Sequence, residues 1–182
     1  MITVKGYQIP NKVSELTVVQ FDRLSKIENS SGDNLDKWIE KFTYLGVDPK
    51  VFDEMSLQEF KESIKEFNDN GTLPDEPTKV IEIDGYTYEA SESVGVKDLA
   101  LIEKKWKKDR DTFTQDCIAV LFKRSDLTRN EHYDESHLKH KKELFKDVKI
   151  EVALPYVVEI MKILTEAVEE LNVTEELESD NS

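Results

Sequence analysis

Two segments decide the fold expected of this chain: VKGYQI at residues 4–9 and IDGYTY at residues 83–88. Each alternates apolar and polar residues around a glycine, a pattern that predicts a β-hairpin with a short turn. Each is followed, after a stretch rich in Ser and Glu, by apolar residues at helical spacing. Such internal similarity predicts a duplicated unit, in which a small hairpin precedes a group of helices.

The first half of the chain carries clear helix start signals. Residues 17–20 and 56–59 have the Ser/Thr-x-x-Gln/Glu spacing of a capping box. We therefore expect helices over residues 18–28, 34–45 and 57–67. Apolar residues at helical spacing are expected to be buried on the third helix: Leu57, Phe60, Ile64 and Phe67.

The second half predicts four more helices. The first two cover residues 96–108 and 112–123, and the second of these is apolar enough to be buried. A third helix is capped by Asp134, and the last begins near Asp147. Pro155 lies inside the last helix. Because proline lacks a backbone N–H, we expect it either to kink this helix or to move the helix start next to the proline.

The fold class predicted from these elements is mainly α with two small β-hairpins (α+β). The Asn-, Gly- and Pro-rich stretch after the third helix predicts a boundary between two repeats. The expected units are residues 1–72, a linker at 73–78, a second hairpin and helices at 79–172, and an acidic flexible tail at 173–182. The two hairpins could join into one four-stranded sheet or each pack on its own helices.

The chain is strongly acidic, with a formal net charge of −14. This charge argues against a nucleic-acid or membrane partner, since both present phosphates to the protein. It is also uneven, because residues 166–182 hold seven acidic residues and neither Lys nor Arg. Residues 97–110 and 139–149, in contrast, are locally basic. They are expected to be solvated helix faces, and the alternative is a basic strip masked by the acidic tail.

No residue pattern indicates catalysis or a cofactor. Cys117 is the single cysteine, and its apolar surroundings predict a buried, unreactive thiol. His137 and His140 share a helix face, but Lys139 lies between them and opposes a metal cation. Glycine-rich phosphate motifs are absent from the sequence. We therefore expect no catalytic residue, no metal, no cofactor and no enzyme activity. The lone cysteine suits a reducing compartment such as the cytoplasm.

Trp106 is unusual among the aromatic residues, because charged residues surround it in the segment EKKWKK at residues 103–108. Its ring could pack with Leu99 and Ile102 on the same helix. It could equally be a partly exposed anchor for a protein partner, since tryptophan is enriched at binding hot spots. The sequence leaves both readings open.

Several ordered features together resemble a known group of proteins. They include LTVVQF at residues 16–21, LGV at 45–47, MSLQEF at 55–60 and CIAVLF at 117–122. The chain resembles the small acidic proteins encoded in the structural gene blocks of tailed bacteriophages, of the tail assembly chaperone kind. The resemblance covers nearly the whole chain up to Asn172, and its motifs are caps, turns and core positions.

The resemblance implies a non-enzymatic morphogenesis factor in the cytoplasm of the bacterial host cell. Such a chaperone binds helical segments of a long tape-measure protein or another tail protein. The residues expected to contact the partner are Trp106, Tyr156 and Met161. Two alternatives are a structural component of the virion tail or neck and an acidic inhibitor of a host protein. Whether the chain forms a homo-oligomer is left open.

Overall fold

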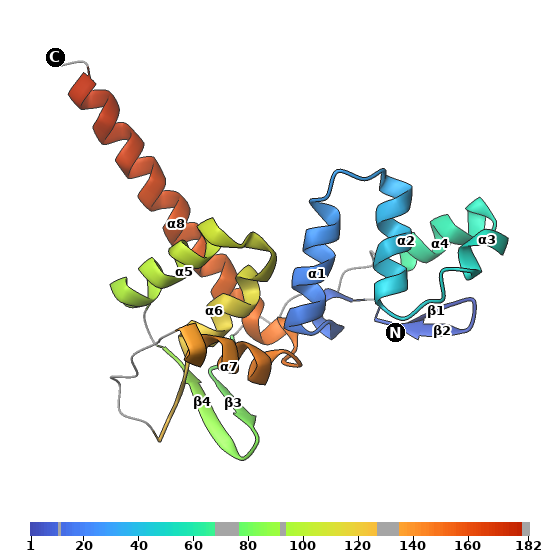
Figure 1. The fold of residues 1–182 in the computed structure, drawn as a ribbon, viewed down its shortest axis with the longest axis horizontal. Coiled ribbons are helices and arrows are strands. Elements are labelled where there is room, and N and C mark those ends of the chain that lie inside the picture. Colours follow the sequence, from blue (N-terminus) through green and yellow to red (C-terminus); the bar gives the residue numbers. More distant parts are fainter. Residues whose placement is uncertain (11, 68–76, 92–93, 127–134, 180–182) are drawn as a thin grey trace.

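The computed structural model describes residues 1–10, 12–67, 77–91, 94–126 and 135–179, with the side chains of residues 135–136 and 167–179 left out of the description. Helices dominate the described residues, and only short strands accompany them (Figure 1). The predicted fold class, mainly α with small β elements, is confirmed. The predicted cap Asp134 and most of the predicted linker at 73–78 lie outside the described residues.

In the first half of the chain, the described residues form one hairpin and four α-helices. In order, its elements are β1 (Ile2–Val4), β2 (Tyr7–Ile9), the 3-10 turn η1 (Val13–Glu15), α1 (Val18–Glu28), α2 (Asn34–Tyr44), α3 (Val51–Glu54) and α4 (Leu57–Phe67). The predicted capping boxes are both formed: Gln20 N donates to Thr17 Oγ1 at 3.2 Å, and Glu59 N donates to Ser56 Oγ at 3.3 Å. Local cap chemistry therefore sets where α1 and α4 begin.

In the second half, the part of the chain that the structure describes forms the other hairpin, a third small strand and four α-helices. Its elements are β3 (Val80–Ile83), β4 (Tyr86–Ala90), α5 (Val96–Lys108), the 3-10 turn η2 (Arg110–Thr112), α6 (Phe113–Leu121), β5 (Phe122–Arg124), α7 (Glu135–Phe145) and α8 (Ile150–Ser179). Helix α8 runs out of the body of the molecule, and its C-terminal end lies beyond the other elements (Figure 1).

Both predicted hairpins are confirmed, and their turns have the same backbone geometry. The two central residues have positive φ in each turn: 47° and 92° at Lys5 and Gly6, 52° and 78° at Asp84 and Gly85. Two consecutive left-handed residues form the turn that matches the twist of a tight hairpin, and glycine adopts this conformation without strain.

The two hairpins do not join into one sheet. Strands β1 and β2 form a two-stranded sheet, and β3, β4 and β5 form a separate antiparallel sheet of three strands. Strand β5 corrects the predicted helix over residues 112–123, since α6 ends at Leu121. Pairing of Phe122 with Ala90 and of Arg124 with Tyr88 extends the chain there, so contacts distant in sequence override the local helical pattern.

Buried side chains form two clusters. The smaller core contains six buried residues, with the aromatic residues of α2 to α4 around them: Ile2, Val4, Ile9, Phe42, Val47 and Phe60. The larger core surrounds α6, and most of its buried residues lie between Tyr88 and Leu164. Four more come from the first half of the chain: Leu16, Val18, Leu24 and Ile27. The predicted boundary near residue 72 remains a prediction. The two cores do not separate at that position, because residues of the first half belong to both of them.

One residue differs from expectation, and one of the two alternatives expected for Pro155 is excluded. Leu57 was expected to be buried, but it is 63% exposed, because it is the first residue of α4 and its side chain lies outside the smaller core. Helix α8 begins at Ile150 and continues through Pro155, so the proline does not set its start. The N–H of Ile150 instead donates to the Leu16 carbonyl at 2.9 Å, which fixes the start of α8 against the first half of the chain.

Candidate functional site

The three residues predicted to contact a partner lie on two helices. Trp106 is near the end of α5, while Tyr156 and Met161 are on α8. All three are half-buried and pack against the larger core. Tyr156 and Met161 are five positions apart, which separates them by about 140° around a helix. The structure therefore does not place them on one face, and their role in binding stays a prediction.

Trp106 packs toward the larger core while part of its surface stays exposed, and its role as a partner anchor stays a prediction. Its ring lies 6.1 Å from the ring of Phe113, between centroids, so one side of it packs toward the larger core. The guanidinium of Arg110 lies 4.9 Å from the Trp106 ring, a cation–π arrangement. The core and a surface cation thus hold this half-buried ring in place.

Tyr156 has structural partners on two elements. Its hydroxyl donates to the carbonyl of Thr78 at 3.0 Å, and its ring meets Phe122 edge to face at 5.4 Å. Burial, followed by the nearby charge of Glu159, raises the pKa of the Tyr156 hydroxyl, so the group remains a donor at neutral pH. These contacts tie α8 to the segment before β3 and to β5.

Met161 belongs to an apolar strip that the sequence analysis did not single out. Leu154, Val158 and Met161 follow one another at spacings of four and three, which places them on one face of α8. We call these three residues the α8 strip. Val158 is 57% exposed, and the other two are half-buried. The strip lies beside the stripe of α8 that is buried in the larger core: Ala153, Val157, Ile160 and Leu164.

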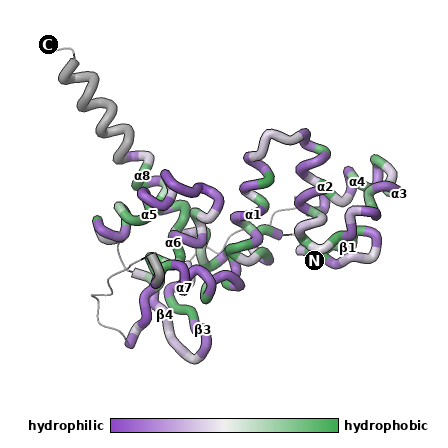
Figure 2. Tube along the Cα trace, in the orientation of Figure 1, coloured by the Kyte–Doolittle hydropathy of each residue, from purple (hydrophilic) through white to green (hydrophobic). Residues whose placement is uncertain are grey.

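A second feature is a cleft of about 550 Å³ between the end of α5, η2, α6 and α7. Five lysines contribute to its walls: Lys105, Lys108, Lys139, Lys142 and Lys146. We call it the lysine-lined cleft. Its lysines come from the two segments that the sequence predicts to be locally basic. These segments lie largely on α5 and α7, and both helices carry hydrophilic stretches (Figure 2). The sequence showed the two segments but not that they face the same space.

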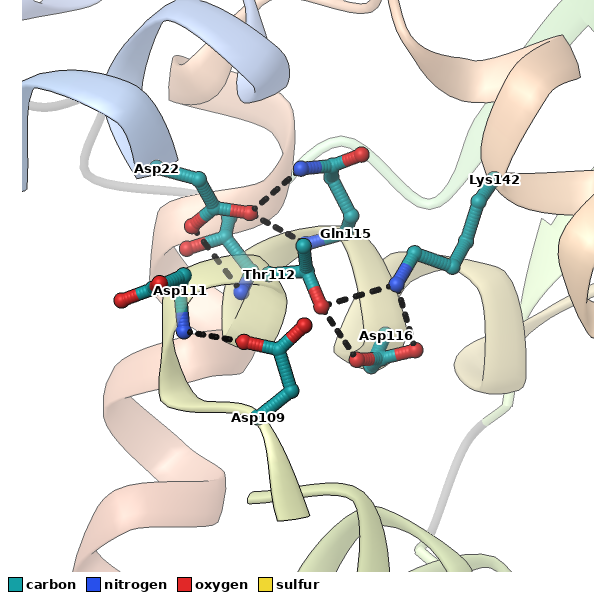
Figure 3. A network of polar contacts seen from close by, with 8 residues as sticks. Asp22, Asp109, Asp111, Thr112, Gln115, Asp116 and Lys142 are labelled. Atoms are coloured by element: carbon teal, nitrogen blue, oxygen red, sulfur yellow. Dashed lines mark hydrogen bonds and ion pairs between the residues drawn. The ribbon is translucent and has the colours of Figure 1, made fainter. Parts of the chain in front are cut away.

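The floor of the lysine-lined cleft is a network around Asp116, which is only 2% exposed (Figure 3). Thr112 donates its hydroxyl to Asp116 at 3.0 Å, and Lys142 Nζ forms an ion pair with the same carboxylate at 3.0 Å. Lys142 also donates to Thr112 Oγ1 at 2.9 Å. This closed triangle satisfies the buried charge of Asp116 and joins α7 to the start of α6.

A second buried carboxylate, Asp22 of α1, caps the first turn of α6 (Figure 3). The backbone N–H groups of Thr114 and Gln115 donate to it at 3.2 and 3.0 Å, and the Gln115 amide donates at 3.1 Å. Burial raises the pKa of Asp22, and these hydrogen bonds oppose the shift. The group acts as a cap supplied by another helix, a role that the sequence pattern could not show.

The remaining candidates for chemistry have no reactive setting. Cys117 is buried as predicted, and burial, followed by the charges of Asp116 and Asp22, raises the pKa of its thiol far above neutrality. A thiol that stays protonated is a poor nucleophile. Among the described residues, no group of three or more His, Cys, Asp or Glu side chains is arranged to hold a metal ion.

Of the helices in the described residues, none combines the length and the apolar character that crossing a membrane requires. Comparison with protein-family models, with curated proteins and with solved structures found no match for this chain.

Proposed function

We propose that this protein is a non-enzymatic assembly factor that binds helical segments of another protein. In its specific form the proposal is a tail assembly chaperone, which holds a tape-measure or tail protein in the bacterial cytoplasm before the tail polymerises. The α8 strip carries the proposal. The resemblance to small acidic phage proteins gives its biological setting.

The α8 strip has the spacing of helix-to-helix recognition. Amphipathic helices dock into apolar surfaces through anchors at positions i, i+3 or i+4 and i+7. Leu154, Val158 and Met161 offer this spacing, and they lie next to side chains that are already buried in the larger core. A partner helix laid along the strip would therefore extend an existing core rather than bind an isolated patch.

The apolar area still open on the strip supports a useful binding energy. Completing the burial of an aliphatic side chain contributes roughly 1.5–3 kcal/mol when the side chain starts fully exposed. Val158 is more than half exposed, and Leu154 and Met161 keep part of their surface in water. Docking on these three residues suits a reversible complex, as a chaperone that later releases its partner requires.

Affinity capture from phage-producing cells tests this function. We expect the tagged protein to capture a long helical tail protein, and Val158→Glu to abolish the capture by placing a charge on the strip. Val96→Glu is the matched control, because Val96 is 86% exposed and is the first residue of another helix, α5. The control variant should capture the partner as the unmodified protein does.

Mature particles must be probed alongside the capture experiment. A chaperone is released before the particle is complete, so the protein should be missing from purified particles. Its presence there at a fixed ratio to the tail subunits would contradict the proposal and identify a virion component. Capture of host proteins alone would also contradict it and favour the inhibitor reading.

A further inference from the structure

The lysine-lined cleft concentrates positive charge on a protein whose net charge is −14. Three carboxylates also line it: Asp109, Asp116 and Glu143. Lys142 pairs with Asp116, Lys146 pairs with Glu143, and Lys105 has an interaction partner as well. Lys108 of α5 and Lys139 of α7 differ from them. Both are exposed, and neither makes a hydrogen bond or ion pair within the part of the chain that the structure describes.

These two cations lie on different walls of the same space, because one comes from the last residue of α5 and the other from α7. A carboxylate entering between them would meet positive charge from both sides. An occupant with several carboxylates would bind more tightly than a single anion, because each exposed ion pair alone contributes little binding free energy. The cleft therefore fits a carboxylate-rich segment of protein.

The chain itself carries a segment of this chemistry. Residues 166–182 contain seven acidic residues and no Lys or Arg, and most of them belong to α8. Helix α8 extends away from the body, so its C-terminal end points away from α7 (Figure 1). An acidic segment that extends away from the cleft of its own molecule would meet the cleft of another molecule.

We propose that the lysine-lined cleft receives the acidic C-terminal segment, residues 166–182, of a second copy of this chain. Cleft and segment are different surfaces, so the contact is head-to-tail. An open assembly therefore has a free cleft at one end and a free segment at the other until a ring closes. Charge complementarity selects this occupant. The protein supplies a carboxylate-rich helix at the same concentration as the basic cleft that fits it.

The association state of the full-length protein tests this inference, by sedimentation velocity over a range of concentrations and salt. We expect concentration-dependent assembly that weakens as salt rises, because exposed ion pairs are screened. The double variant Lys108→Glu/Lys139→Glu should weaken association by about tenfold or more, since it replaces attraction with repulsion at two positions. A protein that is monomeric throughout, or assembly unchanged in this variant, would overturn the inference.

A charge-matched control excludes a general effect of added negative charge. Lys61→Glu/Lys65→Glu makes the same change on the exposed face of α4 and should assemble as the unmodified protein does. Assembly that weakens equally in this control would count against the cleft.

A charge swap identifies the occupant. Alone, the full-length variant Glu169→Lys/Glu170→Lys should associate about tenfold or more weakly than the unmodified protein, as should Lys108→Glu/Lys139→Glu. Mixing the two variants should restore a complex, because the reversed segment of one then meets the reversed cleft of the other. If mixing restores nothing, the second copy is not the occupant. Binding of inorganic phosphate to the cleft, with no self-association, would assign the site to small anions and overturn the proposal.

Discussion

The two cores of this molecule are packed in different ways. In the smaller core, aromatic rings meet around Phe42, whose centroid lies 5.7 Å from that of Trp38 and 6.0 Å from that of Phe60. In the larger core, aliphatic side chains surround α6, nearly all of whose residues are buried. Buried charges accompany both cores but are satisfied differently. Asp22 and Asp116 form hydrogen-bonded networks in the larger core, while Lys41, beside the smaller core, lies 4.2 Å from the centroid of the Trp38 ring and pairs with Glu28 at the surface.

The cores also differ in how far along the chain they reach. The smaller core is made entirely from residues 2–67. The larger core joins α1 to elements of the second half, and the Val18 N–H donates to the Val148 carbonyl at 2.8 Å across that distance. Helix α1 thus belongs by its packing to the second half. A repeat in the sequence is therefore not a repeat in the packing.

Removing the central ring should have the largest effect, and it should affect the cores unequally. Phe42 is fully buried, so Phe42→Ala is expected to cost about 3–5 kcal/mol of the free energy of unfolding of the smaller core. The chain has two tryptophans, with Trp38 beside the smaller core and Trp106 beside the larger. Urea unfolding of the single-tryptophan backgrounds Trp106→Phe and Trp38→Phe therefore reports on each core separately.

We expect Phe42→Ala to lower the Trp38 midpoint far more than the Trp106 midpoint. Phe145→Ala is the matched variant in the larger core, where this buried ring lies 5.1 Å from Tyr88, between centroids, and it should show the reverse order. Equal shifts at both tryptophans would mean that the cores unfold as one unit, and the comparison would fail. Leu45 and Phe67 pack against both clusters, so their contacts would link the unfolding of the two cores.

The sequence predicts the features that depend on neighbouring residues. It does not predict those that depend on residues distant along the chain. The Asp84-Gly85 turn and the Thr17–Gln20 capping box need only neighbouring residues, and both were predicted correctly. The end of α6 was not, because the strand at Phe122 forms only through pairing with Ala90. The assignment of α1 to the larger core likewise depends on partners more than a hundred residues away.

The candidate site shows the same limit. Local charge identified both basic segments, but only the fold brings Lys108 and Lys139 to the walls of one cleft. Met161 was predicted as a contact, and it lies on the α8 strip. Its neighbours Leu154 and Val158 could have been found from their spacing of four and three. They were missed because α8 is apolar on several sides, so spacing alone does not tell which side the core covers.

Breaking the Asp116 network should have an intermediate effect, confined to the larger core. Lys142→Met removes the cation that pairs with a carboxylate only 2% exposed, so we expect a loss of about 1–3 kcal/mol in the free energy of unfolding. Lys104→Met is the control, since Lys104 is an exposed lysine of α5 that belongs neither to the network nor to the lining of the cleft. Urea unfolding followed by Trp106 fluorescence measures both. A loss in the control as large as in Lys142→Met would show that the network contributes nothing specific.

The smallest effect, and the one that separates the cores most directly, is the response to acid. Glu59 links α4 to the first hairpin through Lys5, and the hydrogen bond from Lys5, followed by those from Ser56, lowers the pKa of Glu59 to about 2 from 4.5. A lowered folded-state pKa contributes stability above pH 4.5 that is lost as pH falls toward 2. Asp22 has the opposite sign, because burial raises its pKa above 3.8. Its contribution is complete below pH 3.8 and is lost as pH rises through the folded-state value.

Acidification should therefore weaken the smaller core through Glu59, while protonation of Asp22 favours the larger one. Glu59→Gln should flatten the change in Trp38 midpoint between pH 4.5 and pH 2, and Asp22→Asn should flatten the change in Trp106 midpoint above pH 3.8. Each variant serves as the control for the other tryptophan. If Asp22→Asn instead removed a loss of stability on acidification, its hydrogen bonds with Thr114 and Gln115 would outweigh its burial. The larger core would then depend on an ionised cap, and both cores would respond to acid in the same direction.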